Sequence, residues 1–142
     1  ALADDLKVSN RVKFLRQVEH SDMPKYLRVA DIFIRPSRSE GLGISFLEAM
    51  AAELPVIATP VGGIPDFLFD PDKNGTNAPT GLFCGVDDPK SIATQVKRLI
   101  SDPELRTRIV SNGKKLVIET YEWDLVAYDM QKKVFDKLAI LE

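Results

Sequence analysis

Two glutamates separated by seven residues are the side chains in this sequence best suited to binding chemistry. Glu40 and Glu48 enclose two glycines, Gly41 and Gly43, and a run of helix-forming residues follows. The glycines let a ligand approach the backbone closely, because no Cβ stands in the way. The free N–H groups of a helix that begins after Gly43 carry about half a positive charge, which suits a phosphate.

The position of Glu48 in the predicted helix supports a nucleotide as the ligand. Glu48 lies about five residues beyond Gly43, or ~7–8 Å along the helix axis. This matches the span from a diphosphate to the ribose of the same nucleotide. A carboxylate can accept hydrogen bonds from both ribose hydroxyls. The alternative is a solvated helical glutamate, but its neighbours at i−4 and i+4 are Ile44 and Ala52 rather than Lys, Arg or Gln. The pattern therefore favours a binding role, with Glu40 facing the other end of the ligand.

The elements that must position these residues alternate between strands and helices. Apolar and β-branched runs predict strands over residues 12–18, 31–36, 56–59 and 81–86. Helical patterns cover residues 24–30, 44–53 and 66–69, two stretches opened by Asp88-Pro89 and Asp102-Pro103, and residues 123–138. Asn112-Gly113 predicts a break in the second of those stretches. Alternating strands and helices predict an α/β fold, a Rossmann-like parallel sheet with flanking helices, whose carboxyl edge would carry the Glu40 loop.

Composition excludes several other functions. The chain has 142 residues, most simply one domain, with 44% hydrophobic and 28% charged residues and a net charge of −2. Such a balance gives no footprint for nucleic acid or for an anionic membrane surface. One cysteine, Cys84, and one histidine, His20, exclude a disulfide framework and thiolate or His-rich metal sites. No apolar run approaches the ~20 residues of a transmembrane segment, and we expect a cytoplasmic protein.

The stretch around the glutamates resembles a known family signature. PSRSEGLGISFLEAMAAELPVIATPVGG, residues 36–63, is similar to the signature of the retaining GT-B glycosyltransferases, glycosyltransferase family 4 (group 1) in particular. Its hallmark is a Glu, seven residues and a second Glu. The resemblance covers almost the whole chain, since residues 12–18 resemble the strand before the base-binding loop and residues 81–93 the strand and helix that follow. It implies part of the C-terminal, donor-binding domain of a GT-B fold.

The resemblance also implies a role for each site residue. Glu48 would hold the ribose hydroxyls of a nucleotide-diphosphate-sugar donor, and Glu40 would be the catalytic residue that hydrogen-bonds and orients the transferred sugar. Backbone N–H groups of four residues would bind the sugar and the diphosphate: Gly41, Leu42, Gly43 and Ile44. The nucleobase would border Arg16, Gln17 and Val18, although the family usually has Gly where this chain has Arg16. The resemblance implies no metal, since the family needs none, and no cofactor, since the nucleotide sugar is a substrate.

In the family, further groups come from parts without a counterpart here. An Arg and a Lys from the first βα unit hold the donor phosphates, and a separate N-terminal domain supplies the acceptor site. We therefore expect residues 1–142 to be a single, N-terminally incomplete nucleotide-sugar-binding domain, inactive by itself, with a C-terminal helix over about 123–138. The parent enzyme would transfer a hexose-type sugar to a saccharide or lipid-linked acceptor, the latter at the inner face of the membrane.

Two other functions remain open from the sequence. The chain fits an interaction or assembly module without activity, and also a fragment of a GT-B sugar-nucleotide epimerase, although the Glu-x7-Glu signature favours the transferase. Its association state is a further expectation. The open edges of the strands at 12–18 and 31–36, with an apolar stripe through Trp123, Met130 and Val134, favour a homodimer over a monomer that closes on itself.

Overall fold

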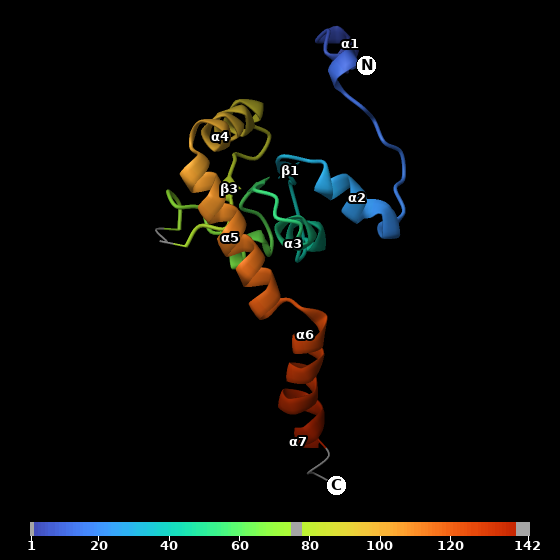
Figure 1. Cartoon of the computed structure of the whole chain (residues 1–142), viewed down its shortest axis with the longest axis vertical. Helices are drawn as coiled ribbons and strands as arrows, with labels where there is room; N and C mark the ends of the chain where they lie inside the picture. Colours follow the sequence, from blue (N-terminus) through green and yellow to red (C-terminus); the bar gives the residue numbers. More distant parts are fainter. Residues whose placement is uncertain (1, 75–77, 139–142) are drawn as a thin grey trace.

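A small parallel sheet organises the chain (Figure 1). The computed structural model describes residues 2–74 and 78–138. Within them the sheet has the order β1-β2-β3, with bounds Phe33–Arg35, Val56–Ala58 and Leu82–Phe83. Both pairs are parallel, and Ile57 of β2 lies between Ile34 and Leu82 of its neighbours. The predicted α/β class with a Rossmann-like parallel sheet is confirmed, with shorter strands than expected.

Helices account for most of the remaining described residues. The α-helices are α1 (Leu2–Asp5), α2 (Met23–Arg28), α3 (Ile44–Ala51), α4 (Pro89–Ser101), α5 (Pro103–Thr120), α6 (Trp123–Met130) and α7 (Asp136–Leu138). Short 3₁₀ turns are η1 (Ser9–Arg11), η2 (His20–Asp22) and η3 (Ile64–Asp66), and η4 (Gln131–Phe135) is a stretch of π-helix. None of the helices described is long and apolar enough to cross a membrane.

The two predicted N-caps form as expected. The Asp88 carboxylate accepts hydrogen bonds from the N–H groups of Lys90 and Ser91, and the Asp102 carboxylate accepts one from Leu105. A proline occupies the first turn of both helices, where its missing N–H costs nothing. These local contacts start α4 and α5 where the sequence predicts.

The core surrounds β2, whose three residues are fully buried. Val56 and Ala58 belong to a cluster with Phe46 of α3, whereas Ile57 belongs to a cluster with Ile109 of α5. Successive strand residues point to opposite faces, so both faces of the sheet are covered, as expected for a parallel strand. This packing fixes the carboxyl ends of β1 and β2, which carry the loops of the site.

The predicted strand over residues 12–18 is wrong. These residues form no strand, and Phe14 is 78% exposed. The segment runs as an extended thread from the blue N-terminal helix to α2 (Figure 1). A strand exists only where a neighbouring strand takes up its hydrogen bonds, and the described sheet offers this segment no neighbour. Its β-forming residues therefore favour an extended backbone without pairing.

The predicted break at Asn112-Gly113 is also wrong, because α5 continues through both residues. Gly113 is buried where α5 crosses α3, and a Cβ placed there would lie 3.3 Å from Met50 Cγ. The glycine thus serves the close approach of two helices. Asn112 points its amide away from the helix and donates a hydrogen bond to the Pro79 carbonyl at 3.0 Å.

The last helical stretch, from α6 to α7, projects away from the sheet (Figure 1). Its apolar stripe lies outside the core, because Trp123 is 76% exposed and Met130 and Val134 are exposed too. Docking of this stripe, and the homodimer, stay predictions.

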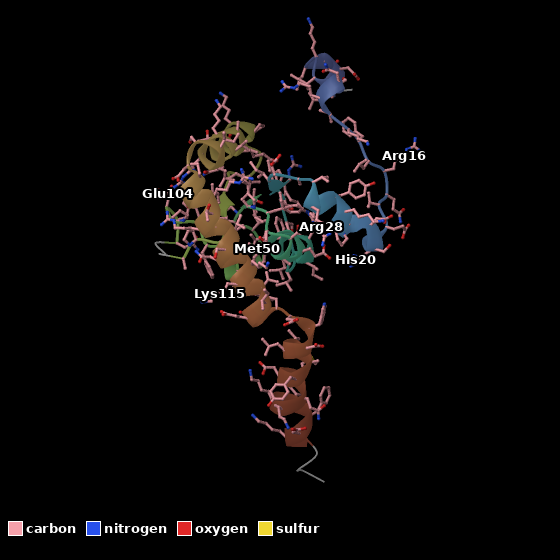
Figure 2. All side chains as sticks on the ribbon, viewed as in Figure 1. Arg16, His20, Arg28, Met50, Glu104 and Lys115 are labelled. Atoms are coloured by element: carbon pink, nitrogen blue, oxygen red, sulfur yellow. The ribbon has the colours of Figure 1, made fainter. Side chains whose placement is uncertain are left out.

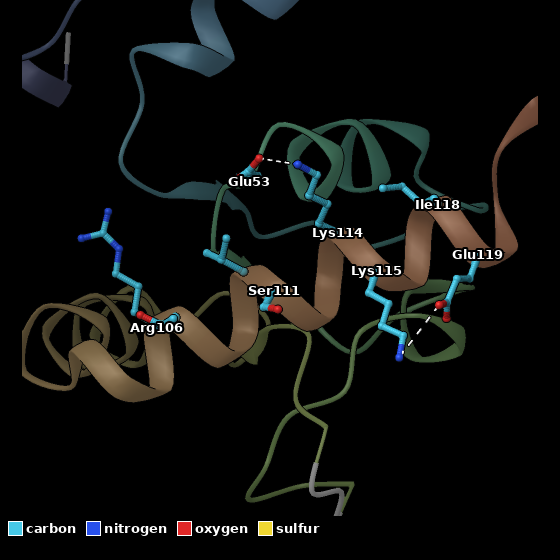
Figure 3. A pocket seen from close by; sticks show the side chains of 9 residues that line it. Glu53, Arg106, Ser111, Lys114, Lys115, Ile118 and Glu119 are labelled. Carbon is cyan, nitrogen blue, oxygen red and sulfur yellow. Dashed lines mark hydrogen bonds and ion pairs between the residues drawn. The ribbon is translucent and has the colours of Figure 1, made fainter.

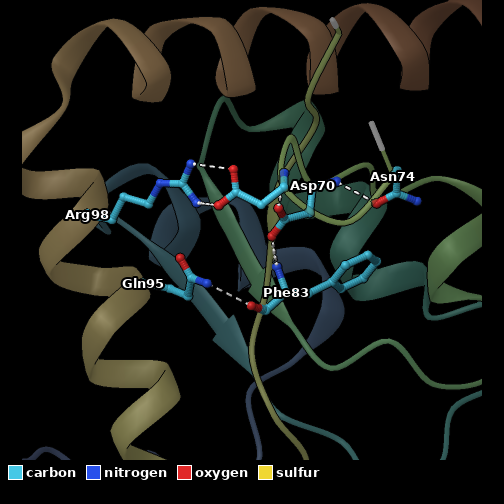
Figure 4. Close-up of polar contacts among 6 residues, drawn as sticks. Asp70, Asn74, Phe83, Gln95 and Arg98 are labelled. Carbon is cyan, nitrogen blue, oxygen red and sulfur yellow. Dashed lines mark hydrogen bonds and ion pairs between the residues drawn. The ribbon is translucent and has the colours of Figure 1, made fainter. Parts of the chain in front are cut away.

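A buried carboxylate closes the outer edge of β3 (Figure 4). Asp70 accepts hydrogen bonds from the N–H groups of Phe83, at 2.7 Å, and Asp72, at 2.8 Å. The Phe83 carbonyl accepts from Gln95 Nε2 at 3.0 Å. The N–H group of the next residue, Cys84, donates to the Ala58 carbonyl in β2. Because backbone groups alternate in direction along a strand, the N–H and carbonyl groups of Phe83 face the opposite, open edge of the sheet. Side chains thus replace a fourth strand there.

Replacing Asp70 with Ala should lower the free energy of unfolding by ~1.5–3 kcal/mol, because two N–H groups lose a charged acceptor. The matched control is Asp72→Ala, which breaks an exposed ion pair with Arg98 and should cost less than ~1 kcal/mol. Urea unfolding followed by circular dichroism measures both. Equal losses would mean that the Asp70 carboxylate does not close the edge.

Candidate functional site

The N-terminus of α3 is built on a glycine in the left-handed conformation. Gly43 has a φ of +76° and caps the helix, which begins at Ile44 as predicted. A Cβ at this position would lie 2.6 Å from the Phe46 ring and 3.3 Å from Glu40 Cγ. The loop after β1 therefore folds tightly over the helix end and carries Glu40 with it.

Two residues that precede it in the chain hold the Glu40 carboxylate. Its side chain is only 15% exposed. Ser37 Oγ donates a hydrogen bond to Glu40 Oε2 at 2.9 Å, and Arg35 Nη2 lies 3.3 Å from the same oxygen. The protein itself thus fixes the orientation of this carboxylate.

The loop after β2 packs against the Glu40 loop and holds it in place. The sequence did not reveal this contact between the two loops. Thr59, fully buried, donates its hydroxyl to the Ser37 carbonyl at 2.5 Å. Gly62 has a φ of +57°, and a Cβ there would lie 1.8 Å from the Glu40 carbonyl oxygen. Gly63 N–H donates to the Gly41 carbonyl at 3.0 Å. The only local signal for this support is a pair of glycines directly after a buried strand.

The proposed donor-binding stretch is open to a ligand. Gly41 is exposed, and a Cβ there would meet no atom within 4 Å. Leu42 and Ile44 are exposed as well, whereas Gly43 is buried beneath them. A ligand can therefore approach this stretch at Gly41, near the positive end of the α3 dipole.

Glu48 lies in the second turn of α3, beside a cavity of about 700 Å³. Its side chain is 32% exposed, and Glu48 Oε1 lies 3.6 Å from Nε2 of His20. Apolar walls come from both sides, with Met23 and Leu27 on α2 and Ala51 on α3. The lining also includes the charged side chains of Arg28, Glu53 and Lys114, so the cavity combines apolar walls with charged groups around Glu48.

The predicted base-binding loop, residues 16–18, does not line the cavity beside Glu48. Arg16 and Gln17 are exposed and Val18 is half-buried, and none of the three lines the cavity. Figure 2 shows Arg16 on the extended segment, above His20 in this view. The residue that reaches Glu48 is His20, which the sequence did not assign to the site. Nucleobase contacts of residues 16–18 stay a prediction.

A second hollow of about 700 Å³ lies along the outer face of α5 (Figure 3). Its cations all face carboxylates: Lys114 pairs with Glu53, Lys115 lies 3.9 Å from Glu119, and Arg106 lies 3.9 Å from Asp31. Neither signature glutamate lines this surface. Paired surface charges offer an incoming ligand little, so we assign no binding role to this hollow.

Other reactive groups show no sign of a catalytic arrangement. In the described ranges, no three His, Cys, Asp or Glu side chains cluster as metal ligands would. Burial raises the pKa of the Cys84 thiol above its usual value, so that this buried thiol stays protonated at neutral pH. The chemistry that the arrangement supports is binding and orientation by the two glutamates and the α3 N-terminus.

Comparisons with known proteins identify the family of this chain. The family model described as Glycosyl transferases group 1 matches residues 1–116. An uncharacterized glycosyltransferase of Methanocaldococcus jannaschii is 39% identical over 126 residues, which are 89% of this chain and 30% of that protein. The GDP-mannose-dependent alpha-(1-6)-phosphatidylinositol monomannoside mannosyltransferase of Mycolicibacterium smegmatis is 31% identical over 129 residues, 86% of this chain and 32% of that protein.

A solved structure supports the same relationship. Sucrose-phosphate synthase from Thermosynechococcus elongatus matches 99% of this chain and 33% of its own, with a TM-score of 0.84 and 28% identity. The parallel sheet with its flanking helices is that of a Rossmann-like C-terminal domain of the GT-B fold. The chain spans about a third of the length of the relatives it matches. On the family match over residues 1–116 of 142, this chain belongs to the glycosyl transferases of group 1.

Proposed function

We propose that this chain is the nucleotide-diphosphate-sugar-binding part of a retaining glycosyltransferase. The observation that carries the proposal is the placement of two carboxylates along α3, with Glu40 held over its N-terminus and Glu48 at the cavity in its second turn. The diphosphate would lie between them, against the N–H groups from Gly41 to Ile44, where Gly41 is open to solvent. Membership of the family, and a relative whose name is GDP-mannose-dependent, support this class of donor.

The nucleoside would occupy the space around Glu48. Its ribose hydroxyls would donate hydrogen bonds to the Glu48 carboxylate, and its base would enter the cavity against the apolar side chains of Met23, Leu27 and Ala51. His20, 3.6 Å from Glu48, stands at the mouth of this cavity. The predicted base loop, Arg16 to Val18, would then border the base from the solvent side.

Transfer would exchange one bond at the anomeric carbon of a hexose-type sugar. The bond to the diphosphate oxygen breaks, the bond to an acceptor oxygen forms, and the anomeric configuration is kept. Catalysis would consist of positioning by Glu40 and stabilisation of the leaving diphosphate by the N–H groups of the α3 N-terminus. The retaining outcome rests on the resemblance to the Glu-x7-Glu signature.

The acceptor side would come from an N-terminal domain outside this chain. Support comes from the relatives, which are about three times as long as the stretch that matches. A saccharide or lipid-linked acceptor is the class we propose, since one relative is named for a phosphatidylinositol mannoside acceptor.

Titration with nucleoside diphosphates tests the donor site directly. Adding UDP and GDP to the isotope-labelled chain should produce saturable NMR shifts around Glu48 and at Gly41 to Ile44. A non-catalytic assembly module would show no saturable signal that depends on Glu48.

The 142-residue chain by itself should transfer no sugar, whatever nucleotide sugar is supplied. The N-terminus of α3 and the Glu48 carboxylate would position a donor, but neither group would position an acceptor. A radiolabelled-sugar assay with an active full-length relative as the positive control measures this. Sugar transfer by the purified chain would contradict the division of labour proposed here.

A further inference from the structure

The end of β1 carries an arginine that contacts both sides of the Glu40 loop. Arg35 Nη2 lies 3.3 Å from Glu40 Oε2, and Arg35 Nη1 donates a hydrogen bond to Ser45 Oγ at 2.6 Å, in the first turn of α3. Its guanidinium carbon lies 5.7 Å from the centre of the fully buried Phe46 ring. We propose that Arg35 is a positioning residue that sets the Glu40 carboxylate for the transferred sugar. The inference rests on the proposed function.

The contacts of Glu40 divide its two oxygens between protein and ligand. Oε2 receives the Ser37 hydroxyl at 2.9 Å as well as the Arg35 guanidinium. Within residues 2–74 and 78–138, Oε1 accepts no hydrogen bond. A carboxylate whose one oxygen is anchored presents the other in a fixed direction, and a sugar hydroxyl is the donor that it would accept.

Only an arginine can make this set of contacts. The planar guanidinium places separate N–H groups toward Glu40 and toward Ser45 while its carbon lies over the Phe46 ring. A lysine ammonium is a single point charge and would serve one of the two partners. Because the Arg35 side chain is 48% exposed, the ion pair adds little to stability, and its effect should appear in ligand orientation instead.

The same loop supplies a matched control. Arg38, three residues further on, is 79% exposed, and its Nε donates to Asp87 at 2.8 Å. It makes no recorded contact with Glu40 among the described residues. Replacing either arginine with Gln removes one positive charge near the loop, so the change in net charge is the same, whereas the contact with Glu40 is lost only in Arg35→Gln.

The decisive quantity is the preference of the chain for a nucleotide sugar over its nucleoside diphosphate. NMR titrations with UDP-glucose against UDP, and GDP-mannose against GDP, give this ratio for each variant. In Arg35→Gln we expect nucleotide-sugar affinity to fall by roughly tenfold relative to Arg38→Gln, with equal diphosphate affinity in both variants. Arg35→Lys should retain diphosphate affinity and lose most of the preference for the nucleotide sugar.

A second background separates positioning from a direct contact. In Glu40→Gln, adding Arg35→Gln should change the ratio by less than about twofold, because no carboxylate remains to be set. Thermal unfolding should show equal stability of the two arginine variants. An equal ratio in Arg35→Gln and Arg38→Gln, or an undiminished effect in Glu40→Gln, would overturn the inference while leaving the donor site intact. Absence of any diphosphate binding by the unmodified chain would instead overturn the proposed function.

Discussion

Replacing Glu48 with Gln should weaken the binding of UDP or GDP by about ten- to a hundredfold. The substitution keeps the size of the side chain. It removes the negative charge that strengthens the hydrogen bonds accepted from the ribose hydroxyls. A hydrogen bond to a charged group contributes ~1.5–3 kcal/mol, which corresponds to that range of affinity. NMR titration of the chain, or calorimetry on a complete enzyme, measures the change.

Two variants with the same chemical change serve as controls. Glu104→Gln, in the first turn of α5, lies outside the cavity lining and should leave nucleotide affinity unchanged. Glu40→Gln should reduce the turnover of a complete enzyme more than its nucleoside diphosphate affinity, because a bare nucleotide carries no sugar. Unchanged affinity in Glu48→Gln would remove this residue from the ribose role. Equal losses in Glu40→Gln and Glu48→Gln would show that the two roles are assigned wrongly.

Replacing Gly62 with Ala should both destabilise the fold and disable the Glu40 loop. The φ of +57° costs a residue with a Cβ about 1–2 kcal/mol. The added Cβ would also lie 1.8 Å from the Glu40 carbonyl oxygen, so one backbone segment must move, for roughly 1–3 kcal/mol more. We expect the free energy of unfolding to fall by about 2–5 kcal/mol, with loss of the preference for nucleotide sugars.

Gly41→Ala provides the contrast, because a Cβ at Gly41 meets open space. Its free energy of unfolding should change by less than ~1 kcal/mol, while donor binding weakens because the ligand approaches the backbone there. Denaturant unfolding and NMR titration of both variants separate the two effects. A Gly62→Ala variant as stable as Gly41→Ala would show that the loop after β2 does not hold the Glu40 loop.

Local signals in the sequence were enough for several elements. The helix starts at Asp88 and Asp102, the start of α3 at Ile44 and the buried strand β2 all follow from residues within one or two turns of each other. Caps and buried strands depend on hydrogen bonds and apolar runs that are short in sequence, so such a pattern suffices. The α/β class follows from the alternation of these elements.

Tertiary structure alone decided the pairing and the support of the site. Residues 12–18 have β-forming side chains, yet they form no strand, because pairing depends on a partner that the segment does not contain. Gly113 looks like a helix stop but lies at a helix crossing. The partners His20 for Glu48, and Thr59 and Gly62 for the Glu40 loop, lie about 20 to 30 residues away along the chain. The sequence therefore determined the signature and its helix. The path of the chain around the sheet brought these distant residues to the glutamates, because contacts between elements depend on packing that no local pattern encodes.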